Sequence, residues 1–78
     1  MPYFHVFLWD GENDLHVAEH DVTTAEFEFA VLNADHVGVS HSSGRPIAFG
    51  STAEGRSLAC VYEIIDEIYC YPITAYEV

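Results

Sequence analysis

The apolar pattern of this chain changes its period near the middle, and that change limits the folds open to it. Before residue 35, apolar residues recur every three or four positions, as on the buried stripe of a helix. After residue 35 they alternate with polar residues and are interrupted by turn residues. Because the chain has only 78 residues, both halves must share one hydrophobic core. We therefore predict a single α+β domain over residues 1–78, with two N-terminal helices packed on a C-terminal antiparallel sheet.

Two helices are expected in the first half. The segment Glu12–His20 contains no proline or glycine, and its apolar residues, Leu15 among them, stand at helical spacing. The second helix is expected over Thr24–Asn33. Its start fits a capping box, in which the Thr23 hydroxyl accepts from a backbone amide of the first turn while Glu26 reaches back to the Thr23 amide.

Five segments have the composition of strands, rich in aromatic and β-branched residues and bounded by turn residues. The last two should form a hairpin that turns at Asp66-Glu67. Pro72 has no backbone N–H to donate and therefore indicates an edge or a bulge. We expect a sheet of about four strands, with the first segment as an added N-terminal strand. The predicted strands are Tyr3–Trp9, His36–Ser40, Pro46–Gly50, Ser57–Ile65 and Ile68–Ala75.

The two cysteines, Cys60 and Cys70, are predicted to be free and buried rather than bonded to each other. If the hairpin turns at Asp66-Glu67, Cys60 lies opposite a residue near Ile73, and Cys70 lies opposite Glu63. The two sulfur atoms would then not face each other. Two cysteines alone also do not make a zinc site.

The charge of the chain disfavours nucleic-acid binding. Thirteen acids oppose two arginines and no lysine, which gives a formal net charge of −11. Such a surface repels phosphate and lacks the cations that release counterions. It favours solubility, in a salty environment for example, or a basic protein partner. Because the chain lacks a long apolar run and a basic leader, we predict a cytoplasmic protein without a membrane segment, either monomer or homodimer.

Several short motifs follow one another in a specific order along the two halves of the chain. The first half contains Trp9-Asp10, Asn13, Ala18-Glu19-His20, Val22-Thr23 and Glu26. The second half contains Arg45, Ile47-Ala48-Phe49-Gly50, Thr52, Gly55-Arg56 and Val61-Tyr62. In combination, over roughly residues 7 to 75, these motifs resemble the BrnT-like toxin family.

BrnT-like proteins are ribonuclease toxins with a RelE-like fold, and a partner antitoxin holds them inactive. The resemblance implies RNA endonuclease activity and an antitoxin-like partner, and the acidic surface suits a basic one. We expect no metal and no cofactor. It places the candidate catalytic residues at His20, Arg45 and Arg56. An imidazole can transfer a proton, and two guanidinium groups can hold a phosphate as its charge develops.

Some residues depart from the family pattern. Leu15–Glu19 contains no lysine, Asp21 replaces the usual glycine, and Tyr76 stands where the family has an arginine. The resemblance thus implies a scaffold whose nuclease activity is weak or lost. The second hypothesis is a non-catalytic interaction module that uses its acidic surface or a sheet edge.

The three candidate residues also have plain structural interpretations. Arg56 follows a turn glycine and could pair with Glu54 or Glu63, while Arg45 could form ion pairs with other acids. His20 stands four residues after His16, a spacing that suits one metal ion, although two helix histidines more often cap, pack or face solvent. An enzyme predicts that the candidate residues converge on one cleft. An interaction module predicts that they lie apart or form local ion pairs.

Overall fold

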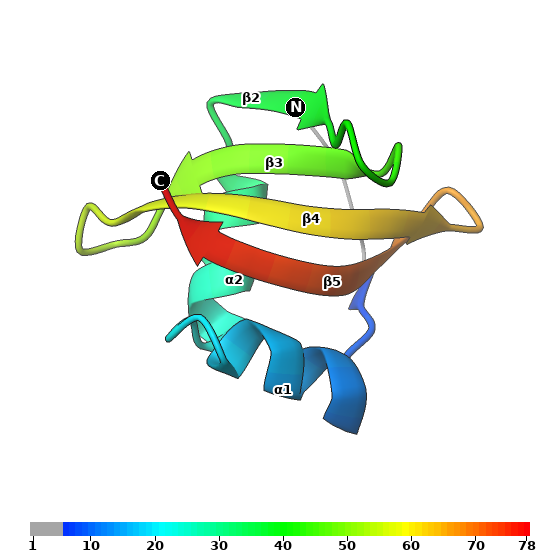
Figure 1. Cartoon of the computed structure of the whole chain (residues 1–78), viewed down its shortest axis with the longest axis horizontal. Coiled ribbons are helices and arrows are strands. Elements are labelled where there is room, and N and C mark those ends of the chain that lie inside the picture. The colour runs from blue at the N-terminus through cyan, green and yellow to red at the C-terminus, as the bar shows by residue number, and fades with distance from the viewer. Residues whose placement is uncertain (1–5) are drawn as a thin grey trace.

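Two helices pack against a five-stranded sheet in the computed structural model, which describes residues 6–78 (Figure 1). This arrangement confirms the α+β fold, including the added N-terminal strand. The strand order is β1-β5-β4-β3-β2, and only β1 runs parallel to its neighbour, β5. The elements are β1 (Val6–Phe7), α1 (Gly11–Ala18), α2 (Thr24–Leu32), β2 (His36–Val39), β3 (Pro46–Ser51), β4 (Ser57–Ile65) and β5 (Tyr69–Glu77).

Within the described residues, the first strand ends at Phe7, two residues before the predicted limit at Trp9. Strand β1 comprises Val6 and Phe7, and the Leu8 amide extends the pairing by donating to the Cys70 carbonyl at 2.9 Å. The predicted strand residues from Tyr3 to residue 5 lie outside the described residues.

Helix α1 begins at a cap that the sequence analysis did not identify. The Asp10 carboxylate accepts hydrogen bonds from the Glu12 and Asn13 amides, and the Asn13 side chain accepts in return from the Asp10 amide. Because Asp21 adopts a left-handed conformation, with φ of 60°, the chain turns soon after Ala18. The helix therefore ends before the predicted limit at His20.

Helix α2 begins as predicted, with the Thr23 and Glu26 capping box in place, and ends at Leu32. It packs closely on β3 because Gly50 has no side chain. A Cβ atom at Gly50 would stand 2.1 Å from the Ala30 carbonyl oxygen. This contact fixes the distance between α2 and the sheet.

The last hairpin has a different register from the predicted one. Its turn contains three residues, 66–68, and a bulge at Val61/Tyr62 shifts the pairing once more. Cys60 therefore lies opposite Ala75, and Cys70 lies opposite Ile64. The predicted partners were wrong, but both cysteines are free and buried as expected. The bulge brings Pro72 opposite Tyr62, which confirms the irregularity predicted from Pro72.

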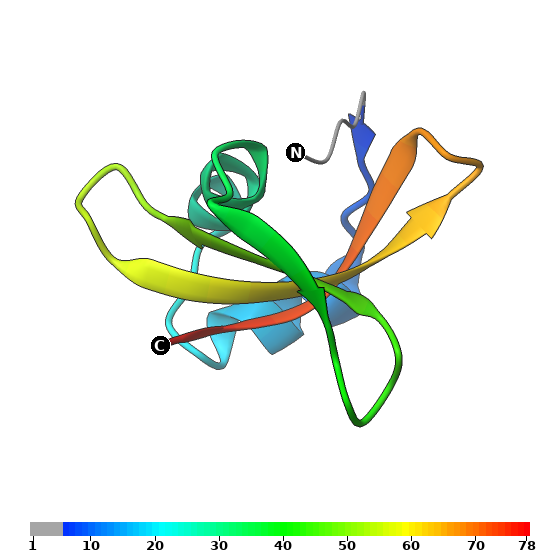
Figure 2. The ribbon, with the colours of Figure 1, turned by 90° about the horizontal axis from the view of Figure 1, so that it is seen from above.

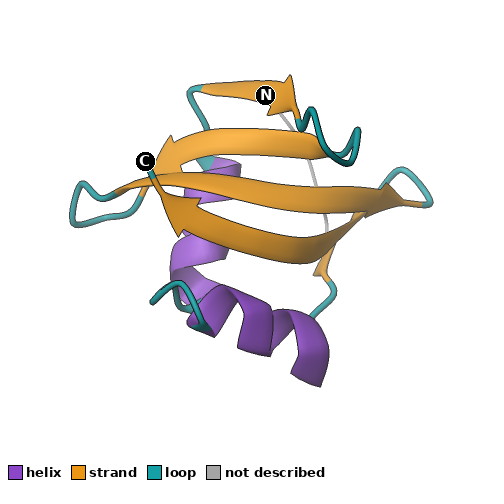
Figure 3. Cartoon of the chain, viewed as in Figure 1, coloured by secondary structure: helices purple, strands orange, loops and turns teal. Residues whose placement is uncertain are grey.

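The two faces of the sheet are covered differently (Figures 2 and 3). Helix α2 lies behind β3 and β4, and α1 lies along β5. The two helices together cover the main core, which includes Phe27, Leu58 and Tyr62. A second, smaller apolar cluster on the other face centres on Ile47 and Val61. No helix among residues 6–78 is long and apolar enough to cross a membrane.

Candidate functional site

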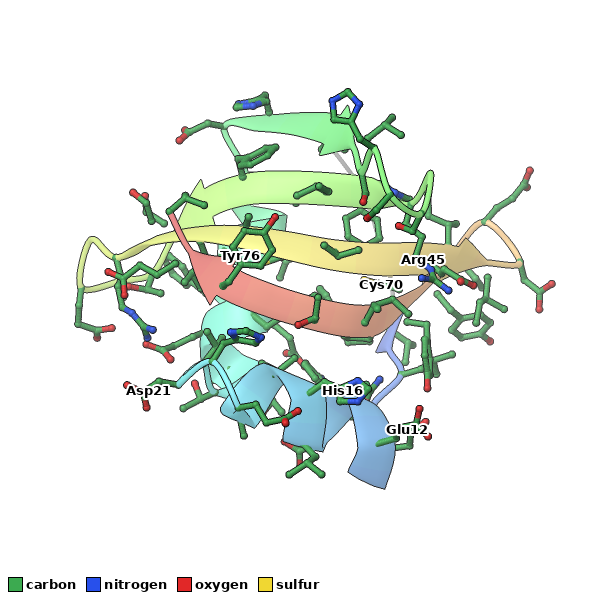
Figure 4. All side chains as sticks on the ribbon, viewed as in Figure 1. Glu12, His16, Asp21, Arg45, Cys70 and Tyr76 are labelled. Carbon is green, nitrogen blue, oxygen red and sulfur yellow. The ribbon has the colours of Figure 1, made fainter. Side chains whose placement is uncertain are left out.

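A polar cleft of about 270 Å³ lies between α1, the strands β4 and β5, and Arg45 just before β3. Three of its residues are labelled in Figure 4: Glu12 and His16 on α1, and Arg45 just before β3. Its lining residues are Glu12, Asn13, His16, Arg45, Glu63, Tyr71, Pro72 and Ile73. The cleft contains one of the three predicted site residues, Arg45.

Strand register places Arg45 beside a carboxylate. Ile47 pairs with Val61, so Arg45 stands across from Glu63 when the antiparallel register is continued by two residues. The Arg45 Nε atom donates to the Glu63 Oε1 atom at 2.7 Å, and both side chains are about two fifths exposed. The guanidinium group of this cleft is thus already paired with an acid.

The Tyr71 hydroxyl of the cleft also has a hydrogen-bond partner. It donates to Asp10 Oδ2 at 2.7 Å. Hydrogen bonds from the Asn13 amide and then from Tyr71 lower the pKa of Asp10, which stays ionised as the helix cap. The same bond, with partial burial, raises the pKa of Tyr71, so the phenol remains a donor rather than a base.

Acids outnumber cations around this cleft. Glu12, Glu63 and Asp10 surround it, against one arginine and the His16 imidazole. The imidazole could exchange a proton with a bound ligand. A phosphate, however, would enter a site where the one guanidinium group is paired and the other charges are negative.

Arg56 lies at the opposite end of β4 from Arg45. Its Nη1 atom is 3.4 Å from the Glu26 carboxylate of α2, and its Nε atom is 3.2 Å from Glu77 of β5. The hydrogen bond to Glu77 is the main cause of a raised Arg56 pKa. The partners proposed from the sequence, Glu54 and Glu63, are not those that Arg56 contacts.

His20 follows α1 in the turn that carries the left-handed Asp21. Its ring packs edge-on against Tyr76, with ring centroids 6.4 Å apart. Among residues 6–78, no group of three or more His, Cys, Asp or Glu side chains could hold a metal ion. His16, by contrast, lines the cleft on the side of β5.

The structure does not bring the three predicted site residues together. Arg56 immediately precedes Ser57, whereas Arg45 pairs with Glu63, seven residues further along the same strand. At about 3.3 Å per residue, these positions are roughly 20 Å apart. His20 contacts the Tyr76 end of β5 and does not line the cleft that contains Arg45.

The sequence analysis did not assign the cleft residues to one site. It considered His16 as a metal ligand or as a helix residue that caps, packs or faces solvent, and it assigned no role to Tyr71. The link between Asp10 and Tyr71 spans 61 positions. The parallel pairing of β1 with β5 brings these two segments together, and although the sequence predicted a first strand, it did not predict which strand it pairs with.

Comparison of the chain with protein-family models, with curated proteins and with solved structures finds no match in any of the three.

Proposed function

We propose that this chain is a non-catalytic interaction module that binds a basic partner protein through its acidic surface. The observation that carries the proposal is the pairing of both arginines, Arg45 and Arg56, with carboxylates at opposite ends of β4. A ribonuclease must stabilise the charge that develops on phosphate. These arginines are the only Lys or Arg residues of the chain, and each is already neutralised where it lies.

The distribution of the acids supports the same proposal. None of the thirteen carboxylates is buried, and three of them pair with the arginines. The densest run lies on and around α1. We call it the α1 acidic face, and it consists of Asp10, Glu12, Asp14, Glu19 and Asp21. A positively charged partner would be attracted at long range and oriented by this face.

Binding of a fluorescent lysine-rich peptide, followed by polarisation at low salt, tests the proposal. The variant Glu12→Gln/Asp14→Asn/Glu19→Gln removes three charges from the α1 acidic face and leaves the Asp10 cap intact. We expect it to bind at least several-fold more weakly than the wild type, and added salt to weaken binding further.

The control removes three charges elsewhere, with Asp35→Asn, Asp66→Asn and Glu67→Gln. These residues are exposed and lie outside the α1 acidic face. If both triple variants lose the same affinity, the protein attracts cations only through its total charge, and the proposed docking face is refuted.

The second candidate is a weak RNA endonuclease of the BrnT-like type, regulated by an antitoxin. Its support is the cleft in which His16, Arg45 and Tyr71 meet. The test is cleavage of a messenger RNA in the absence of metal. Activity that is lost in both His16→Ala and Arg45→Ala but kept in His20→Ala would favour this candidate, with His16 as the proton-transfer group. No cleavage by the wild type at high protein concentration and low salt would exclude it.

A further inference from the structure

A second, less polar hollow lies at the other end of the molecule. We call it the Phe29 groove. It measures about 190 Å³ and lies between the start of α2 and the β3–β4 turn. Its lining residues are Ala25, Glu26, Phe29, Thr52, Ala53 and Glu54. This volume is below the roughly 300 Å³ at which small-molecule sites begin, and it suits a single inserted side chain.

The exposure of Phe29 is not explained by the core. The buried side of α2 is formed by Phe27, Ala30 and Val31, which are fully covered. Phe29 points away from that core and is 43% exposed. An aromatic ring at such a position costs solvation free energy, whereas it offers a flat apolar surface to a ligand.

The rim of the groove is negatively charged. Glu26 and Glu54 both line it, and Glu54 is exposed. The Thr23 amide lowers the pKa of Glu26 and keeps its carboxylate ionised. Arg56 forms ion pairs with both Glu26 and Glu77. The acids at the rim and beside it therefore outnumber this single cation. An anionic or purely apolar ligand would therefore be disfavoured here.

We propose that the Phe29 groove binds an arginine side chain presented by a basic partner protein. The guanidinium plane would stack on the Phe29 ring, and its N–H groups would donate to Glu54 and to the outer edge of Glu26. The methylene stem would lie against Ala25 and Ala53. This site rests on the proposed function, since it gives the basic partner one specific anchoring residue.

The first test uses N-acetyl-arginine amide, with N-acetyl-citrulline amide as its uncharged analogue of nearly the same shape. Each is titrated into ¹⁵N-labelled protein, and amide chemical shifts are followed. We expect saturable shifts confined to residues 25–29 and 52–54 for the arginine probe, with a dissociation constant of roughly 1 mM. Shifts of equal size for citrulline, or shifts spread over all acidic regions, would overturn the proposal.

Matched variants test the two walls of the groove separately. Phe29→Ala and Glu54→Gln should each weaken binding of the arginine probe several-fold. Leu32→Ala removes the other large exposed apolar side chain of α2, and Glu67→Gln removes a distant charge. Both controls should bind as the wild type does. A far-ultraviolet circular dichroism spectrum establishes that each variant is folded, so an unchanged affinity in folded Phe29→Ala contradicts the groove.

The lysine-rich peptide separates this inference from the proposed function. If the α1 charge variant weakens that peptide while Phe29→Ala and Glu54→Gln leave the arginine probe unaffected, the groove is refuted and the interaction module stands. If the arginine probe binds as expected and a lysine analogue binds equally well, stacking of the guanidinium plane is refuted. If neither probe binds the wild type, both proposals fail.

Discussion

Gly50→Ala should destabilise the fold far more than one added methyl group normally does. The new Cβ would stand 2.1 Å from the Ala30 carbonyl oxygen and 3.2 Å from the Ala34 Cα atom. Real Cβ contacts essentially never fall below 3.0 Å, and the obstructing atoms belong to the backbone. Helix α2 would have to retreat by roughly 1 Å, the difference between these limits, and would loosen its packing on β3 and β4.

The cost of that retreat is about 3 kcal/mol, at the upper end of the range for an overpacked core. A 78-residue domain has a total stability of only about 4–12 kcal/mol, so the loss should be large in urea denaturation followed by circular dichroism. Gly11→Ala is the matched control, because a Cβ there meets nothing within 4 Å at the start of α1. It should leave stability unchanged or raise it by up to about 1 kcal/mol. Equal midpoints for the two variants would refute the close packing of α2 on β3.

Three further predictions concern other parts of the fold. Burial raises the pKa of Cys60 and of Cys70 to about 12, so neither thiol should react with a disulfide reagent at pH 8 until the protein unfolds. Fast labelling of the native protein would contradict their burial. Glu67 adopts a φ of 67°, and Glu67→Gly should therefore raise the unfolding free energy by about 0.5–1 kcal/mol, whereas Glu54→Gly, at a position without positive φ, should not. The folded-state pKa of Asp10 is lowered, so its stabilising effect is present above pH 3.8 and is lost as the pH falls through the folded-state value. The difference in melting temperature between the wild type and Asp10→Ala should accordingly shrink below pH 3.8, and a difference that grows on acidification would contradict the cap.

The elements were predictable where the sequence carries a local signal. The Thr23 and Glu26 box, the segment Ser57–Ile65 and the change of period all act within a few residues, and all three were read correctly. Register is different, because one extra turn residue and one bulge moved Cys60 from the predicted Ile73 to Ala75. Pro72 indicated an edge or a bulge, but no local pattern in the sequence gives the resulting pairing or the third residue of the turn.

The candidate site was less predictable than the fold, because its contacts join distant positions. Arg45 and Arg56 are both separated from their carboxylate partners by 18 or more residues. With two arginines and thirteen acids, the sequence predicts that each arginine forms an ion pair. It does not predict which acid is the partner. Only the strand register selects Glu63 for Arg45 and Glu77 for Arg56.

The α1 acidic face contains charges that stability alone does not explain. Glu12 and Asp14 lie in the first turn of α1, where the helix dipole favours acids. Glu19 caps the other end and Asp21 follows it, so these two carboxylates stand where the dipole favours cations instead. Neither is among the acids that pair with an arginine. A basic partner on this face would neutralise the unfavourable charges, so its binding free energy would include relief of repulsion already present in the folded chain.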